Sequence, residues 1–141
     1  MLRGVTRSGK STLAKALGDP SLFGFGRPFV QTVQSAADPD LRDYDMDNDG
    51  YIVFDNVNDM SFILRQRALF QANNDIHTLG ASATGIYSYS VLLWRVPIVC
   101  TVDTSAAWDE REDWIKENCF SVQLDGPCYF GGAVRDLYEP M

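Results

Sequence analysis

Apolar residues along this chain form two kinds of segment, short continuous runs and longer stretches with helical spacing. The short runs are bounded by Gly, Pro or Asp, which is typical of strands buried in a parallel sheet. The predicted strands are residues 29–33, 51–54, 96–101 and 120–124. The predicted helices are residues 11–17, 57–73 and 108–118, and residues 78–93 have the pattern of a hairpin. Strands that alternate with helices predict an α/β fold, with a mostly parallel sheet covered by helices.

The composition is that of a globular domain with a substantial core. Hydrophobic residues make up 45% and charged residues 22% of the 141 positions. No apolar run approaches the roughly 20 residues of a membrane helix, and no secretory signal is visible. Together with three cysteines that lack metal-ligand spacing, this predicts an intracellular protein of the cytoplasm or nucleus with no membrane partner. Residues 1–126 are expected to form the domain, and residues 127–141 a C-terminal tail.

A glycine-rich segment near the beginning of the chain carries the strongest chemical signal. Residues 4–11 match the pattern Gly-x-x-x-x-Gly-Lys-Ser/Thr at every fixed position. Glycines let backbone N–H groups approach phosphate oxygens without a Cβ in the way. Lys10 can reach the β- and γ-phosphates, Ser11 can bind Mg²⁺, and the following helix directs its amino end at the phosphates. The residues predicted to bind ATP are Gly4, Val5, Thr6, Arg7, Ser8, Gly9, Lys10, Ser11 and Thr12.

The position of this phosphate-binding loop (P-loop) in the chain is unusual. A buried strand normally precedes such a loop, yet three residues stand before Gly4. Because strands usually run about five residues, we expect the first strand to be truncated, as in a fragment of a longer protein or a gene model that starts too late.

A second buried strand, expected beside the P-loop, ends in an acidic residue. Ile52, Val53 and Phe54 lead directly into Asp55. In P-loop proteins an aspartate at this place holds Mg²⁺. Asp55 is therefore predicted to hold Mg²⁺ together with Ser11.

The residues just before this strand permit a different interpretation. Asp45, Asp47, Asp49 and Gly50 copy the spacing of an EF-hand calcium loop. The twelfth position is Asn56 rather than the bidentate Glu that closes such a loop. We therefore favour a solvated acidic loop, with a calcium module as the alternative.

Together these segments resemble a superfamily 3 helicase domain, the ATPase of replication proteins in small DNA viruses. The matching parts are motif A at residues 4–11, motif B at residues 51–56 and motif C at residues 96–103. The resemblance implies a three-layer P-loop NTPase core in which water attacks ATP in line. It also implies a ring-shaped homo-oligomer and a hairpin before motif C that contacts single-stranded DNA.

The chain departs from the family pattern at two catalytic positions. Asn56 stands where the family has an acidic general base, and an amide can orient a water but cannot take its proton. Asp59, one helical turn further, is a candidate substitute. Asp103 stands where the family has an Asn that senses the γ-phosphate, and a carboxylate would repel that phosphate. Thr101 is the candidate polar sensor, unless it caps the end of its strand.

The nucleic-acid contacts and the arginine finger are less defined. Tyr87 and Tyr89 lie where the family's hairpin is expected, but no Lys or Arg occurs between residues 77 and 95, so base stacking and core packing both remain open. The net charge of −7 argues against broad charge-driven binding to nucleic acid. Candidates for an arginine finger are Arg95, Arg111 and Lys116.

The chain is thus predicted to be an ATPase that drives replication-type remodelling of nucleic acid, with Lys10, Asp55, Asn56, Thr101 and Asp103 as its catalytic residues. Two alternatives keep the same fold. A small nucleotide or nucleoside kinase would need an acceptor pocket and an Arg-rich lid, and residues 104–118 offer a single Arg. A catalytically impaired nucleotide-binding remnant would explain the two departures from the family pattern.

Overall fold

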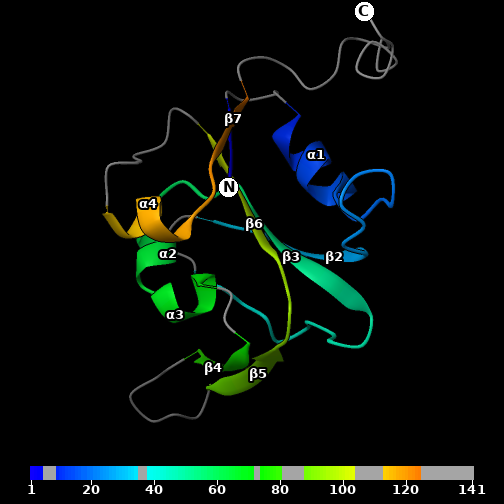
Figure 1. The fold of residues 1–141 in the computed structure, drawn as a ribbon. Coiled ribbons are helices and arrows are strands. Elements are labelled where there is room, and N and C mark those ends of the chain that lie inside the picture. The colour runs from blue at the N-terminus through cyan, green and yellow to red at the C-terminus, as the bar shows by residue number, and fades with distance from the viewer. Residues whose placement is uncertain (5–8, 35–37, 72–73, 81–87, 104–112, 125–141) are drawn as a thin grey trace, which may run out of the picture.

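The computed structural model of the chain describes residues 1–4, 9–34, 38–71, 74–80, 88–103 and 113–124. Within these residues the strands of the main sheet lie in the order β2-β3-β6-β1-β7, and every neighbouring pair is parallel (Figure 1). The bounds are β1 (Leu2–Gly4), β2 (Arg27–Thr32), β3 (Asp49–Asp55), β6 (Ile98–Asp103) and β7 (Val122–Leu124). The predicted α/β class and the mostly parallel sheet are confirmed.

Alternating side chains of β3 separate the core into two apolar layers. Tyr51 and Val53 pack on one face of the sheet with Ala14 of α1 (Lys10–Ala16). Ile52 and Phe54 belong to the cluster on the other face, which includes residues of α2 (Ser61–Leu64), α3 (Arg67–Phe70) and α4 (Asp113–Asn118). Figure 1 shows α1 on one side of the sheet and the other helices on the opposite side. The arrangement is therefore three-layered, because a two-residue period sends successive β3 side chains to opposite faces.

The short strand expected before the glycine-rich segment is β1. It pairs with β6 on one side, where Leu2 is opposite Thr101, and with β7 on the other, where Leu2 is opposite Val122. The strand ending in Asp55, β3, is separated from β1 by β6 in the sheet.

The prediction of one long helix over residues 57–73 is wrong. Two short helices, α2 and α3, occupy this segment, and the backbone of Gln66 between them has a non-helical φ of −126° and ψ of 47°. At the beginning of the segment, the Val57 N–H donates to the Thr101 carbonyl at 2.9 Å, which holds this residue against β6. Tertiary contacts thus override a local pattern of helical periodicity.

A second, two-stranded sheet contains the predicted antiparallel pairing, although its first arm begins at Asp75, before the predicted range of 78–93. Its antiparallel arms are β4 (Asp75–Leu79) and β5 (Tyr89–Leu93), and Tyr87 lies outside the described residues. His77, Leu79 and Leu93 are buried on its inner face, whereas Ile76 and Leu92 are exposed on the outer one. None of the helices in the described ranges is long and apolar enough to cross a membrane.

Two glycines let the connection after α1 lie directly against β3. A Cβ on Gly18 would stand 1.8 Å from the Gly26 carbonyl oxygen, and one on Gly50 would stand 1.8 Å from the Phe25 carbonyl oxygen. Real Cβ atoms do not approach backbone atoms this closely, so only glycine fits either position without backbone movement. The close approach packs residues 25 and 26 against the beginning of β3.

Candidate functional site

Two hydroxyl groups and one carboxylate meet at the carboxyl edge of the main sheet. The Ser11 hydroxyl donates to Asp55 Oδ1 at 2.6 Å. The Thr101 hydroxyl donates to the same oxygen, also at 2.6 Å. The structure thus brings together one residue from each of the three predicted motifs, across separations of 44 and 46 positions.

The strand order explains how these residues meet. Asp55 is the last residue of β3, and Thr101 lies near the end of the neighbouring β6. Ser11 is in the first turn of α1, on the face of the sheet where Asp55 projects. Parallel strands bring their carboxyl ends to one edge, so side chains at the ends of β3 and β6 become neighbours.

Gly9 makes the turn from which α1 begins. Its φ of 86° and ψ of 12° lie in the left-handed region, which glycine enters without a steric penalty. Its carbonyl accepts the Leu13 N–H at 2.9 Å, the first intrahelical bond of α1. Lys10 follows as the first helical residue and is half-buried, while Thr12 is exposed. The remaining residues of the predicted loop, Val5, Thr6, Arg7 and Ser8, lie outside the described residues.

Thr101 is placed behind Asp55 rather than in front of it. Its side chain is completely buried, and its oxygen accepts the Asn56 N–H at 2.8 Å while its proton goes to Asp55. A hydroxyl has a single proton to donate, so none is left for a phosphate in this arrangement. The geometry favours a positioning role for Thr101 over the predicted role of a γ-phosphate sensor.

Neither Asn56 nor Asp59, the two residues considered for proton abstraction, has the properties of a good general base. Asn56 has a φ of 66°, a left-handed conformation that Asn adopts more readily than most residues, and its side chain is exposed. Asp59 Oδ1 accepts the Ser61 N–H at 2.8 Å, at the beginning of α2. This hydrogen bond from the Ser61 backbone lowers the pKa of Asp59, which makes that carboxylate a weaker base.

Two further predicted positions are partly described. Asp103 ends β6 opposite Gly4, which ends β1, and the Asp103 side chain lies outside the described residues. Arg95 has a φ of 54° and precedes β6, so it lies at the amino edge of the sheet, away from Asp55. The side chains of the other arginine-finger candidates, Arg111 and Lys116, also lie outside the described residues.

The acidic loop before β3 uses its carboxylates internally. Asp49 is buried and accepts the Arg27 Nε–H at 2.7 Å and the Asp45 N–H at 2.9 Å. Asp45 in turn accepts the Asp47 N–H at 2.9 Å. In the described part of the chain, no group of three or more His, Cys, Asp or Glu side chains could hold a metal ion. The loop geometry therefore disfavours the calcium alternative.

Tyr89 forms a hydrogen bond and a cation–π contact within the protein. Its hydroxyl accepts the Leu41 N–H at 2.8 Å, and the Arg42 guanidinium carbon lies 4.6 Å from the ring centroid. Both contacts tie β5 to the loop before β3. They favour the packing interpretation of this tyrosine over base stacking.

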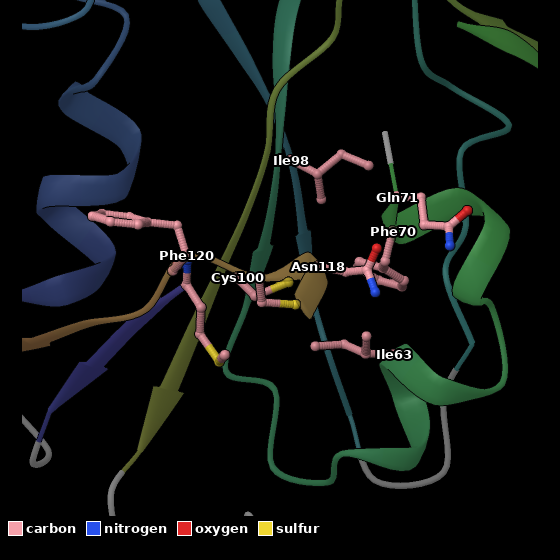
Figure 2. A pocket seen from close by; sticks show the side chains of 9 residues that line it. Ile63, Phe70, Gln71, Ile98, Cys100, Asn118 and Phe120 are labelled. Carbon is pink, nitrogen blue, oxygen red and sulfur yellow. The ribbon is translucent and has the colours of Figure 1, made fainter. Parts of the chain in front are cut away.

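A cavity of about 230 Å³ lies on the opposite face of the sheet, beside α2, α3 and α4. Figure 2 shows Ile63 and Phe70 across this cavity from Cys100. Burial raises the pKa of the Cys100 thiol to about 12, and burial also raises that of Cys119. Both thiols are therefore protonated at neutral pH, which disfavours nucleophilic or metal-ligand roles.

Tyr51 packs on the α1 face of the sheet, and its contact with α1 was not predicted from the sequence. Its hydroxyl donates to the Ala14 carbonyl of α1 at 2.7 Å, inside the core. The available signal was a phenol within a run of buried apolar residues, since a buried tyrosine usually finds a partner for its hydroxyl.

Comparison of the chain with protein-family models, curated proteins and solved structures finds no match. What the described residues define is an α/β protein with a parallel sheet and a Ser–Asp–Thr cluster at its carboxyl edge. A functional interpretation therefore depends on the motif residues and on their geometry.

Proposed function

We propose that this chain is a P-loop NTPase core that binds MgATP at the amino end of α1. The observation that carries the proposal is the hydrogen bond between Ser11 and Asp55. The glycine-lysine-serine pattern predicts a phosphate site from residues 4–11 alone, and it says nothing of Asp55. A hydroxyl and a carboxylate in contact at this place supply oxygen ligands of the kind Mg²⁺ prefers.

The topology of the sheet supports the same location. From β1 the chain passes through α1 on one face to β2, beyond β6 and β3. From β6 it passes through α4 on the other face to β7, beyond β1. The connections that follow β1 and β6 thus pass over opposite faces of the sheet and run in opposite directions. Such a place is a topological switch point, and open α/β sheets bind ligands there. The segment after β1 is the glycine-rich loop.

Each residue has a defined task in the proposed site. Lys10 offsets the charge of the β- and γ-phosphates, and backbone N–H groups of the loop bind their oxygens. Ser11 and Asp55 are the residues that would hold Mg²⁺, which neutralises the phosphates when bound. Ser11 donates its proton to Asp55, so the lone pairs of its oxygen remain for the ion. Thr101 fixes the orientation of the Asp55 carboxylate.

By resemblance to superfamily 3 helicases, hydrolysis would drive remodelling of nucleic acid by a homo-oligomeric ring with single-stranded DNA as its partner. A second candidate is a nucleotide-binding protein with impaired hydrolysis. The exposed amide of Asn56 and the low pKa of Asp59 favour this second candidate, because neither group is a good acceptor for the proton of an attacking water.

Binding of a fluorescent ATP analogue tests the proposal. The wild-type chain is expected to bind in the presence of Mg²⁺, and Lys10→Ala is expected to weaken binding by roughly tenfold or more. Lys15→Ala is the matched control, since this exposed lysine lies in the last turn of the same helix. Absence of binding at millimolar ATP, or equal effects of the two variants, would overturn the proposal.

Phosphate release then separates the two candidates. Release that single-stranded DNA stimulates supports the helicase-like ATPase. No release from the wild type, but release from Asn56→Asp, supports the impaired protein. Transfer of phosphate to an added nucleoside would instead establish a kinase.

A further inference from the structure

Tyr51 connects β3 with α1 through the hydroxyl of a completely buried side chain. The phenol donates to the Ala14 carbonyl at 2.7 Å, across 37 positions of sequence. Its ring packs against Phe25, with 5.4 Å between the ring centroids. Burial raises the pKa of this phenol, so it remains a protonated donor throughout the neutral range.

Tyr51 and Asp55 lie on the same face of β3, four residues apart. Asp55 receives the Ser11 hydroxyl at 2.6 Å, and Tyr51 reaches Ala14 at 2.7 Å. Four residues of strand span about 13 Å, so the two bonds leave β3 at separate positions and meet α1 at Ser11 and Ala14, one helical turn apart. Two directional contacts restrict the position and the tilt of a helix more than one contact does.

The other contacts between these elements lack this directionality. Ala14, Leu17 and Val53 form an apolar layer, and apolar burial depends on area rather than on orientation. The helix has seven residues and no side-chain hydrogen bond at its N-cap. A helix this short depends on tertiary contacts for its order. The Tyr51 hydroxyl therefore contributes strongly to the position of α1.

We propose that Tyr51 is a positioning residue for the nucleotide site, whose hydroxyl holds α1 so that Ser11 stays in reach of Asp55. This inference rests on the proposed function. Tyr51 itself touches neither the phosphates nor the ion in this account. Its effect is on the geometry of the residues that hold Mg²⁺, and therefore on the dependence of ATP binding on Mg²⁺.

The substitution Tyr51→Phe removes the hydroxyl and keeps the packed ring. Tyr89→Phe is the matched control, because the Tyr89 hydroxyl also bonds to a backbone group, the Leu41 N–H, outside the Ser11–Asp55 cluster. Both substitutions remove a tyrosine hydroxyl that bonds to the backbone; the Tyr51 hydroxyl also interacts with the Leu17 and Gly18 N–H groups at the end of α1. If only Tyr51→Phe changes hydrogen exchange in α1 or the Mg²⁺ dependence of ATP binding, the effect comes from the place of this hydroxyl beside α1.

The first measurement needs no nucleotide. Amide hydrogen exchange, followed by mass spectrometry, is expected to be roughly three- to tenfold faster over residues 10–17 in Tyr51→Phe, as for the loss of one net hydrogen bond. Tyr89→Phe is expected to leave exchange in residues 10–17 unchanged. Equal exchange in the wild type and in Tyr51→Phe would refute the positioning role.

The second measurement is a Mg²⁺ titration of ATP binding. In Tyr51→Phe the Mg²⁺ concentration for half-maximal binding is expected to rise roughly three- to tenfold, with ATP affinity in EDTA unchanged. A role confined to stability would lower Tm and leave the Mg²⁺ dependence as in Tyr89→Phe, which would contradict the inference. If the wild type binds no ATP, the proposed function fails, whereas hydrogen exchange still decides whether Tyr51 orders α1.

Discussion

The substitution Thr101→Val removes a hydroxyl that serves two partners at the centre of the site. In the wild type this group donates to Asp55 Oδ1 at 2.6 Å and accepts the Asn56 N–H at 2.8 Å. Valine has nearly the same shape, so no cavity forms and no backbone change is required. The substitution therefore reports the two hydrogen bonds rather than a loss of packing.

The magnitude follows from the burial of Thr101, whose side chain has no solvent exposure. A hydrogen bond to a charged group contributes about 1.5–3 kcal/mol, and an N–H left without its partner costs about 1–3 kcal/mol. Valine recovers part of this through its greater hydrophobicity. We expect the free energy of unfolding to fall by about 2–3 kcal/mol, a large part of the roughly 5–15 kcal/mol that is usual for a domain.

Urea unfolding followed by circular dichroism measures this change. With a denaturant slope of about 1–3 kcal/mol per molar urea, the midpoint is expected to fall by roughly 1–2 M. Thr32→Val is the matched control at an exposed position in the edge strand β2 of the same sheet, and it should shift the midpoint by less than about 0.3 M. Equal midpoints for Thr101→Val and Thr32→Val would refute the assignment of Thr101 as a support for Asp55.

Three further predictions concern other parts of the molecule. Because the pKa of Cys100 is raised to about 12, the folded state keeps this thiol neutral while the unfolded state ionises above about pH 9. Stability should therefore fall by up to about 1.4 kcal/mol per pH unit between pH 9 and 12, and urea unfolding of Cys100→Ala should lack this part of the slope. Asp49→Ala removes a buried carboxylate that accepts the Arg27 Nε–H and the Asp45 N–H, and it should lower the urea midpoint. In a related test, calcium should leave the wild-type Tm unchanged within about 1 °C, and a larger rise would restore the calcium alternative. Asp59→Asn should leave any phosphate release intact, because Asp59 caps the turn at Ser61, and complete loss of release would identify it as the base after all.

The elements around the site were predictable because local signals define them. The apolar run before Asp55 predicts β3, and the left-handed glycine before Lys10 marks the beginning of α1. The second arm of the hairpin, β5, was predictable from the alternation of residues 86–93. In each case the chemistry of neighbouring residues along the chain is enough to define the element.

The features that sequence reasoning missed depend on distant residues. The insertion of β6 between β1 and β3 is a property of the whole sheet, and no local pattern encodes it. The helical pattern of residues 57–73 does not form one helix: Val57 bonds to Thr101, and the backbone of Gln66 leaves the helical conformation between α2 and α3. The same holds for Tyr51, since its partner Ala14 is 37 positions away.

The most direct test of the proposed nucleotide site is calorimetric titration of ATP with and without Mg²⁺ into the wild type and Ser11→Ala. Ser90→Ala in the hairpin is the matched serine control. The account predicts that Mg²⁺ strengthens ATP binding to the wild type and to Ser90→Ala, and that Ser11→Ala loses most of this strengthening. An Mg²⁺ effect that Ser11→Ala leaves unchanged, or a wild type that binds no ATP, would contradict it.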